Sequence, residues 1–252
     1  MDTRSLADRL TKARTSTTAI PQLSDDVPDL DLETGYAVQR LLREGRGQLV
    51  GWKLGVTSRA KQQQVWVDSP IYGFLASDHV LELGEPLRTA EHISPRCEPE
   101  IVFVMGRDLT GAHVTATEVL AATAGVAVGI EVLDSRYTDY RFTMPDVVAD
   151  NASAGRYVVG TPVPPDRIDL RLVGVVLEHN GDVVATASGA ASLGHPAAAV
   201  AWLVRSLAGS GEGLRAGDVV LSGGLTAAVP VSAGDVVVAS VDRIGSVELA
   251  CR

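Results

Sequence analysis

The sequence predicts an α+β protein in which a helical N-terminal layer lies on a β-rich body. Apolar residues recur at helical spacing within the first fifty residues. Short runs of β-branched residues, separated by glycine-containing turns, dominate the remainder. We therefore expect a helical segment at residues 1–50 and a β-rich body at residues 51–252. No low-complexity stretch divides them, so we expect one functional domain.

Two helices are expected in the first part of the chain. Residues 5–14 and 32–46 both carry apolar side chains at intervals of three and four. A proline-bearing connection separates the two segments, and Gly45 and Gly47 end the second helix. These helices form the expected N-terminal layer.

Strands are expected from residue 49 onward. Residues 49–55 are a strand candidate, and residues 98–106 and 126–134 are rich in valine and isoleucine. Between the last two, residues 115–125 begin with a threonine cap and end in glycine, which predicts a short helix.

The last hundred residues have the pattern of antiparallel β-structure. Residues 172–189 predict a hairpin, because Asn180-Gly181 suits a type I′ turn. Residues 193–209 predict a helix with a proline in its first turn. Two similar turn-plus-strand units follow at residues 215–224 and 232–241.

Composition excludes several classes of partner. The formal net charge of −9 gives no general attraction to nucleic acid or anionic lipid. No apolar run reaches the roughly 18 residues of a membrane span, and the charged start predicts no secretory signal. Cys97 and Cys251 lie in unrelated contexts, so we expect reduced thiols in a cytoplasmic protein. A small anionic substrate would need local cations or a metal.

Three acids in apolar strands are the strongest candidates for chemistry. Glu98 and Glu100 would share one face of a strand, because side chains at i and i+2 point the same way. Glu131 interrupts a second apolar strand. Three such carboxylates suit a hard cation such as Mg²⁺ or Mn²⁺. The alternative is that all three face solvent on half-buried strands.

Other polar residues have two interpretations each. Lys53, in an apolar strand, either reaches the surface or lies near an anion. The segment 134–141 is either a charged surface loop or part of a site. Asp78 could belong to a turn, and His195 could simply begin a helix. The 222–226 segment, SGGLT, either brings backbone N–H groups to a ligand or forms a tight hairpin.

Together these segments resemble one family over nearly the whole chain. The motifs are, in order, VGWKLGVTSRAK, SPIYGFLASD, PRCEPEIVFVMGRDL, IEVLDSRYTDYRF, VVADNAS, GVVLEHNGDVV, LGHPAAAVAWL and SGGLTAAVPV. They are similar to the 4-oxalocrotonate decarboxylases and to the related 2-hydroxypenta-2,4-dienoate hydratases of the fumarylacetoacetate hydrolase-like superfamily. The resemblance implies a mixed β-sheet roll with the metal at its mouth and the N-terminal helices beside it.

The resemblance also implies roles for individual residues. It implies a metal, usually Mg²⁺, on Glu98, Glu100 and Glu131. It implies Lys53 as the active-site cation and Asp78 as an active-site acid. Arg141 is expected to orient the leaving carboxylate. Further substrate-binding candidates are Arg136, Ser153, Gly224, Thr226 and Trp66.

The decarboxylase branch is the expected one. The stretches SPIYGFL, DSRYTDYRF and GGLTAAVPV resemble decarboxylases more than hydratases. Trp66 departs from the family pattern, where decarboxylases tend to have glycine. Hydrolases of the superfamily use a His/Glu pair to activate water, but no His or Glu lies between Lys53 and Asp78. This argues against hydrolysis of a carbon–carbon bond.

The expected reaction is metal-dependent loss of CO₂ from a 2-oxo-3-enedioate, giving a 2-hydroxydienoate in aromatic-compound catabolism. The main alternative is a dienoate hydratase. A tautomerase or isomerase on the same scaffold is a further alternative, and a metal-free stabilising homologue ranks last because all three acids are present. The resemblance implies either a homo-oligomer or a complex with the hydratase that consumes the product.

Overall fold

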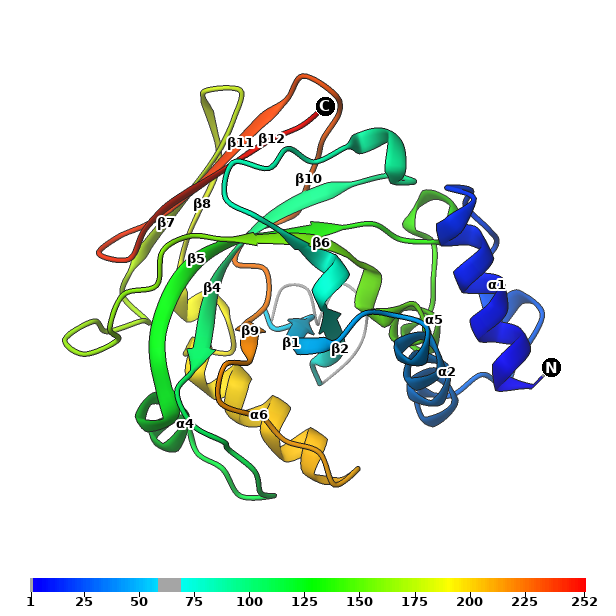
Figure 1. Cartoon of the computed structure of the whole chain (residues 1–252), viewed down its shortest axis with the longest axis horizontal. Helices are drawn as coiled ribbons and strands as arrows, with labels where there is room; N and C mark the ends of the chain where they lie inside the picture. The colour runs from blue at the N-terminus through cyan, green and yellow to red at the C-terminus, as the bar shows by residue number, and fades with distance from the viewer. Residues whose placement is uncertain (1, 59–68) are drawn as a thin grey trace.

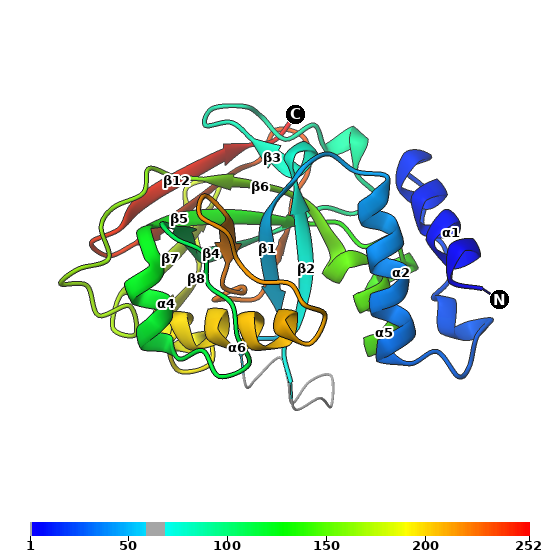
Figure 2. The same ribbon diagram turned by 60° about the horizontal axis from the view of Figure 1, so that its bottom comes forward.

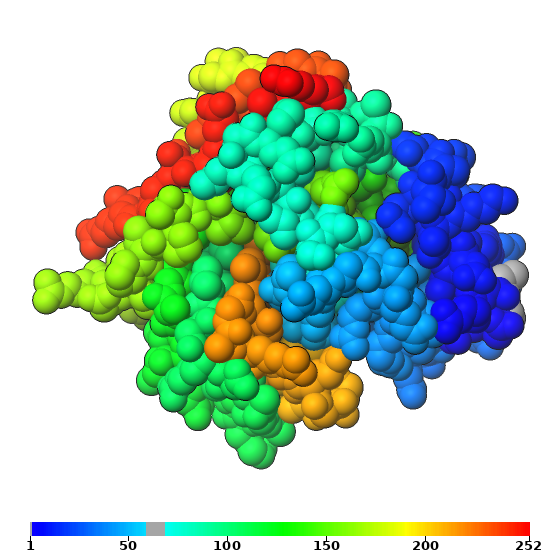
Figure 3. All heavy atoms as spheres, viewed as in Figure 1, coloured from blue at the N-terminus to red at the C-terminus, as the bar shows by residue number. Residues whose placement is uncertain are grey.

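The N-terminal helices lie beside the β-rich body in the computed structural model, which describes residues 2–58 and 69–252 (Figure 1). Asp2 caps the N-terminus of helix α1 (Thr3–Thr15), and Asp31 caps that of helix α2 (Leu32–Glu44). Each aspartate accepts a hydrogen bond from a backbone N–H in the first turn, at 2.8 Å in both cases, which satisfies an otherwise unpaired donor. Figure 3 shows these helices, in blue, on one side of the molecule.

The two helices share an apolar cluster with later parts of the chain. Leu6 and Leu10 of α1 and Val38 of α2 are fully buried in it, together with Tyr137 and Ala149 from beyond the middle of the sequence. The N-terminal layer is therefore packed onto the body through side chains from both. A division at residue 50 stays a prediction.

Two sheets form the body. The larger contains β1 (Leu49–Gly55), β2 (Ile71–Ala76), β3 (Val80–Leu81), β4 (Arg96–Met105), β5 (Thr123–Leu133), β6 (Ala154–Val159), β9 (Val219–Leu221) and β10 (Val229–Pro230). Its strand order is β2-β1-β9-β4-β5-β6-β3, with β10 paired to β4. The sheet is mixed, because β1 pairs with β9 and β3 with β6 in parallel.

The smaller sheet is antiparallel throughout. It contains β7 (Gly174–His179), β8 (Asp182–Ser188), β11 (Val236–Val241) and β12 (Gly245–Ala250), in the order β12-β11-β7-β8. Strands β11 and β12 pack against β5 of the larger sheet. The main core lies between the sheets and continues beneath helix α6 (Pro196–Ala208), which packs against β1 and against α4 (Ala116–Ala122) (Figure 2).

Most predicted elements are confirmed. The helix expected at 115–125 has the Thr115 cap but ends at Ala122, because Thr123 begins β5. Asn180 and Gly181 both have positive φ, at 55° and 86°, as a type I′ turn requires. The purely antiparallel expectation for the last hundred residues was wrong for β9. This strand belongs to the larger sheet, where it lies between β1 and β4 and runs parallel to β1.

The mixed roll implied by the resemblance is confirmed by this topology. Short helical segments close the ends of strands, including α5 (Met144–Ala149) and the 3₁₀ turns at Ser77–His79 and Asn151–Ser153. None of the helices within residues 2–58 and 69–252 is long and apolar enough to cross a membrane.

Candidate metal centre

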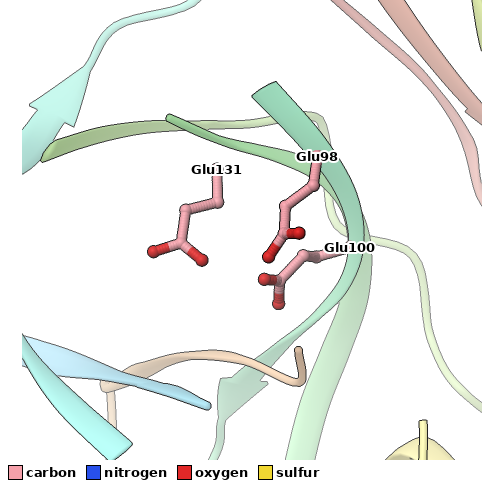
Figure 4. Close-up of side chains that lie close together, drawn as sticks. All are labelled: Glu98, Glu100 and Glu131. Carbon is pink, nitrogen blue, oxygen red and sulfur yellow. The ribbon is translucent and has the colours of Figure 1, made fainter. Parts of the chain in front are cut away.

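The three predicted acids meet in the body of the protein. Glu98 and Glu100 lie on β4, and Glu131 lies on β5 as the direct cross-strand partner of Glu98. One carboxylate oxygen from each residue lies within 4.8 Å of the others. All three side chains are buried and converge on the same space (Figure 4). The alternative of three solvent-facing acids was wrong.

Burial makes this cluster of negative charge unfavourable by itself. The pKa of Glu100 is raised well above its ordinary value, first by burial and then by the charges of Glu131 and Glu98. Burial also raises the pKa of Glu131, although the positive charge of Lys53 opposes the shift. Like charges held this close require a cation between them or uptake of protons.

The glycine turn at residues 222–226 closes against the triad. The Gly223 N–H donates a hydrogen bond to Glu100 Oε2 at 2.6 Å. A Cβ on Gly224 would lie 2.1 Å from the carboxyl carbon of Glu98, so only glycine leaves room for this carboxylate. The turn therefore brings one backbone N–H, that of Gly223, to the site, where its partner is a protein carboxylate. Thr226 is half-buried, and its hydroxyl donates to the Ala227 carbonyl at 2.9 Å.

Lys53 projects inward from β1. Its ammonium lies 2.8 Å from Glu131 Oε1 and donates a hydrogen bond to the carbonyl oxygen of Ala152, also at 2.8 Å. The side chain is only 2% exposed, so the alternative of a lysine reaching the surface was wrong. A buried ammonium is stable only when paired, and here a carboxylate and a carbonyl both pair with it.

An unusual turn carries the Ala152 carbonyl. Asn151, Ala152 and Ser153 have φ values of 52°, 51° and 57°, a left-handed conformation that costs energy at non-glycine residues. The Asn151 side chain holds the turn against β2. Its Oδ1 accepts from the Phe74 N–H at 2.8 Å, and its Nδ2 donates to the Phe74 carbonyl at 3.0 Å.

The sequence pattern around Asn151 did not predict this clamp. One signal could have found it. Gly73 interrupts an otherwise apolar strand, and a glycine there often marks the close approach of another backbone. A Cβ on Gly73 would lie 2.7 Å from the carbonyl oxygen of Asn151.

Of two other predicted substrate-binding residues, one is free to bind a ligand and the other is not. The Ser153 hydroxyl is buried and makes no hydrogen bond to any part of the chain that the structure describes, so it is available to a ligand beside Lys53. Arg136 is engaged in the protein itself. Its guanidinium donates to Asp150 Oδ1 and to the carbonyl oxygens of Asp134, Asp150 and Ala154. These contacts give Arg136 a structural role and do not support substrate binding.

The remaining candidates lie toward the surface or outside the described residues. Asp78 belongs to the 3₁₀ turn after β2, and its carboxylate pairs with Arg46 at 2.8 Å rather than with Lys53 or the triad. Arg141 is exposed, and its side chain makes no ion pair within residues 2–58 and 69–252. Trp66 lies outside the described residues. His195 begins α6, where its Nδ1 accepts from the Ala197 N–H at 2.9 Å, as a structural cap.

The donor set fits a hard divalent cation. Glu100 Oε1 and Glu131 Oε2 are buried, and no hydrogen-bond donor among the described residues reaches either. Unpaired buried carboxylate oxygens are costly, and a metal ion would satisfy them. An all-oxygen set suits Mg²⁺ or Mn²⁺ better than a soft metal. The triad can therefore hold Mg²⁺, with the ammonium of Lys53 beside it.

A curled mixed sheet that buries three carboxylates and a lysine defines a metal-dependent enzyme. The model of the fumarylacetoacetate (FAA) hydrolase C-terminal family matches residues 37–251. The chain belongs to this family.

Named relatives divide between two reactions. The chain is 43% identical over 235 residues to a 4-oxalocrotonate decarboxylase of Pseudomonas sp. CF600, covering 91% of this chain and 89% of the relative. It is 42% identical over 253 residues to the TodF product hydratase of Pseudomonas putida F1, covering 98% and 94%. The structure of 4-oxalocrotonate decarboxylase from Pseudomonas putida G7, complexed with magnesium and adipate, matches with a TM-score of 0.95 at 39% identity. That match covers 99% of this chain and 97% of the other.

Proposed function

We propose that this protein is a Mg²⁺-dependent decarboxylase of a 2-oxo-3-enedioate of the 4-oxalocrotonate type, with Mn²⁺ as an alternative ion. The products are CO₂ and a 2-hydroxydienoate. The observation that carries the proposal is the buried ammonium of Lys53 against three convergent carboxylates. The high structural similarity to a decarboxylase solved with magnesium and a six-carbon diacid supports the choice of reaction.

Each residue of the site has a role in this reaction. Glu98, Glu100 and Glu131 hold the ion, which when bound supplies Lewis-acid stabilisation of negative charge on the substrate's 2-oxo oxygen. The Lys53 ammonium lies beside that position and stabilises the same developing charge. The electron pair of the breaking carbon–carbon bond moves through the alkene toward the 2-oxo group. The Ser153 hydroxyl, which has no partner among the described residues, can donate to the bound carboxylate or oxo group.

Charge balance requires at least one more cation. Three carboxylates, one divalent ion and one ammonium cancel, yet the substrate brings two negative charges. The residue we assign to the second substrate carboxylate is Arg141, because it is exposed and forms no ion pair within the described parts of the chain. Its role is orientation, since a tight ion pair would favour the charged ground state over departing CO₂.

A hydratase is the second candidate. Relatives named as hydratases are 41–42% identical to this chain over more than 90% of its length. A hydratase substrate carries a single carboxylate, which the metal would bind, and so it needs no cation at the position of Arg141. The two reactions therefore differ in the requirement for a second anion site.

A direct assay separates the two. The protein is given 4-oxalocrotonate and, separately, 2-hydroxypenta-2,4-dienoate, and CO₂ release and dienoate consumption are followed. We expect CO₂ release that stops on chelation and returns with Mg²⁺ or Mn²⁺. Rapid hydration of the dienoate without CO₂ from any diacid would establish the hydratase instead.

Arg141→Ala tests the second carboxylate site. We expect KM for the diacid to rise roughly 10-fold or more, as for loss of a charge-assisted contact, with a smaller change in kcat. Binding of a mono-acid dienoate should be unchanged. Arg107→Ala, at another exposed position, is the matched control. Unchanged KM in Arg141→Ala, with CO₂ release intact, would remove Arg141 from the site but keep the reaction.

We also propose a cytoplasmic location, and self-association or a complex with the enzyme that consumes the dienoate product. The chemistry supports the complex, because a 2-hydroxydienoate tautomerises in water and direct transfer would limit that loss. No nucleic acid or membrane partner is proposed, given the net charge of −9.

A further inference from the structure

A cavity with both polar and apolar lining lies beside the turn that contains Asn151. It has a volume of about 380 Å³ and opens between α1, the end of α2 and the turn that follows β2. Arg14, Arg46, His79 and Arg136 line it, and neither Lys53 nor any residue of the triad does. Its volume falls within the range of roughly 300–1,000 Å³ typical of small-molecule sites.

Positive charge at this cavity is only partly neutralised. Arg136 pairs with the buried Asp150, and Arg46 pairs with Asp78 at 2.8 Å. The Arg156 guanidinium donates to the backbone carbonyl of Asp78. Arg14 forms no ion pair among the residues that the structure describes, although the charge of Asp78 opposes the lowering of its pKa.

Acids are also present at the rim. Glu44 pairs with Arg4 at 3.0 Å, and Asp8 is exposed on α1. The arginines nevertheless repel one another. Burial first, and then the charge of Arg14, lowers the pKa of Arg46 to about 10. Arg14 stays exposed at the rim, and its partial desolvation, followed by the charge of Arg136, lowers its pKa. The cluster is therefore short of negative charge despite these acids.

A buried histidine adds a neutral donor. His79 is 2% exposed, and its Nδ1 accepts a hydrogen bond from the Ala76 N–H at 3.1 Å. The neutral ring must then carry its proton on Nε2. No acceptor for this N–H is found in the described parts of the chain, although the ring lines the cavity. A neutral N–H on the lining of a cavity can donate to an anion bound there.

We propose that this cavity binds a small oxyanion, of the carboxylate or phosphate type, through Arg14, Arg46 and the Nε2–H of His79. Arginine forks and a neutral imidazole N–H both suit an oxyanion with several acceptor atoms. The site is distinct from the metal centre and does not depend on the proposed reaction.

The test uses the full chain, stripped of metal by a chelator that is then removed by dialysis. Inorganic phosphate and succinate are titrated separately by calorimetry, with sodium chloride at equal ionic strength as the reference. We expect saturable binding of at least one of the two anions. Binding of phosphate alone, or of succinate alone, identifies the class of ligand.

A matched pair of variants on one helix locates the site. Arg14→Gln and Lys12→Gln each remove one positive charge from the last turn of α1, but only Arg14 lines the cavity. We expect Kd to rise roughly 10-fold or more in Arg14→Gln and to be unchanged in Lys12→Gln. Arg46→Gln, also at the cavity, should repeat the effect if Arg14→Gln folds poorly.

Two results would overturn the proposal. One is that neither anion binds beyond the effect of sodium chloride. The other is that binding occurs but is equal in wild type, Arg14→Gln and Arg46→Gln, which would place the anion elsewhere, for example beside Lys53.

Discussion

Lys53 and Glu131 form a buried ion pair, with 2.8 Å between Nζ and Oε1, across strands that are not neighbours. In the sheet order, β9 and β4 lie between β1 and β5. Three strand spacings of about 4.8 Å would separate the two backbones in a flat sheet. The curl of the sheet and two long inward side chains close this distance. The ion pair can therefore form only because the sheet is rolled.

Lys53→Met should remove catalysis while leaving the fold. We expect kcat to fall by at least ~100-fold, a typical loss for one preorganised charge partner. Methionine fills a similar volume, and a bound ion would still compensate Glu131. The measurement is steady-state turnover together with Mg²⁺ titration. Lys12→Met, at an exposed position of α1, is the control, and near-wild-type turnover of Lys53→Met would refute the assignment.

Asn151→Asp should misplace the partner of Lys53. The aspartate can still accept from the Phe74 N–H, but its second oxygen would face the Phe74 carbonyl, where the amide now donates. We expect the free energy of unfolding to fall by about 1–3 kcal/mol. We also expect kcat to fall about 10-fold with little change in KM, because the Ala152 carbonyl would shift away from Lys53.

A double-mutant cycle tests whether this effect passes through the lysine. If Asn151 acts by positioning Lys53, the change in kcat should be much smaller in a Lys53→Met background than in the wild type. Equal losses in both backgrounds would mean that Asn151 serves only the stability of the fold.

The strand period alone predicts that Glu98 and Glu100 share a face. That Glu131 joins them depends on the pairing of Glu98 with Glu131 across β4 and β5, and the sequence between two strands does not determine such a register. For Arg136, the sequence did not predict where the side chain points. It lies in a motif beside the site, but its direction depends on the buried Asp150 and on three carbonyl groups from the 134–154 region. Local pattern therefore identifies strand-borne ligands better than loop residues, whose partners come from the tertiary structure.

Stability should decrease at acid pH because of His79. Burial first, and then nearby arginines, hold the pKa of this imidazole well below its ordinary 6.5. Below about pH 6.5, His79 is therefore protonated in the unfolded chain but stays neutral in the folded chain. The contribution of His79 to the free energy of unfolding is fully present above pH 6.5. It is lost by about 1.4 kcal/mol per pH unit as the pH falls toward the lowered pKa.

His79→Asn should make this loss shallower. The Asn Oδ1 can accept from the Ala76 N–H, and the side chain does not titrate. The measurement is urea unfolding between pH 5 and 7.5, in buffer without phosphate or carboxylate. His113→Gln, at an exposed position, should keep the wild-type slope. Equal slopes in wild type and His79→Asn would assign the acid sensitivity to other groups.

Gly224→Ala should damage the metal centre and leave the fold intact. The added Cβ would lie 2.1–2.3 Å from the carboxylate atoms of Glu98, and no backbone atom is among its closest contacts. A carboxylate at the end of a flexible side chain can move. We therefore expect the Glu98 carboxylate to be displaced while the backbone stays in place. We expect Mg²⁺ affinity to fall roughly 10- to 100-fold, as for other disturbances around a metal ligand. Gly174→Ala is the control, because a Cβ there meets nothing within 4 Å. Calorimetric Mg²⁺ titration of both variants, with circular dichroism to confirm folding, makes the comparison. Undiminished affinity in a folded Gly224→Ala would show that Glu98 is not needed to hold the ion.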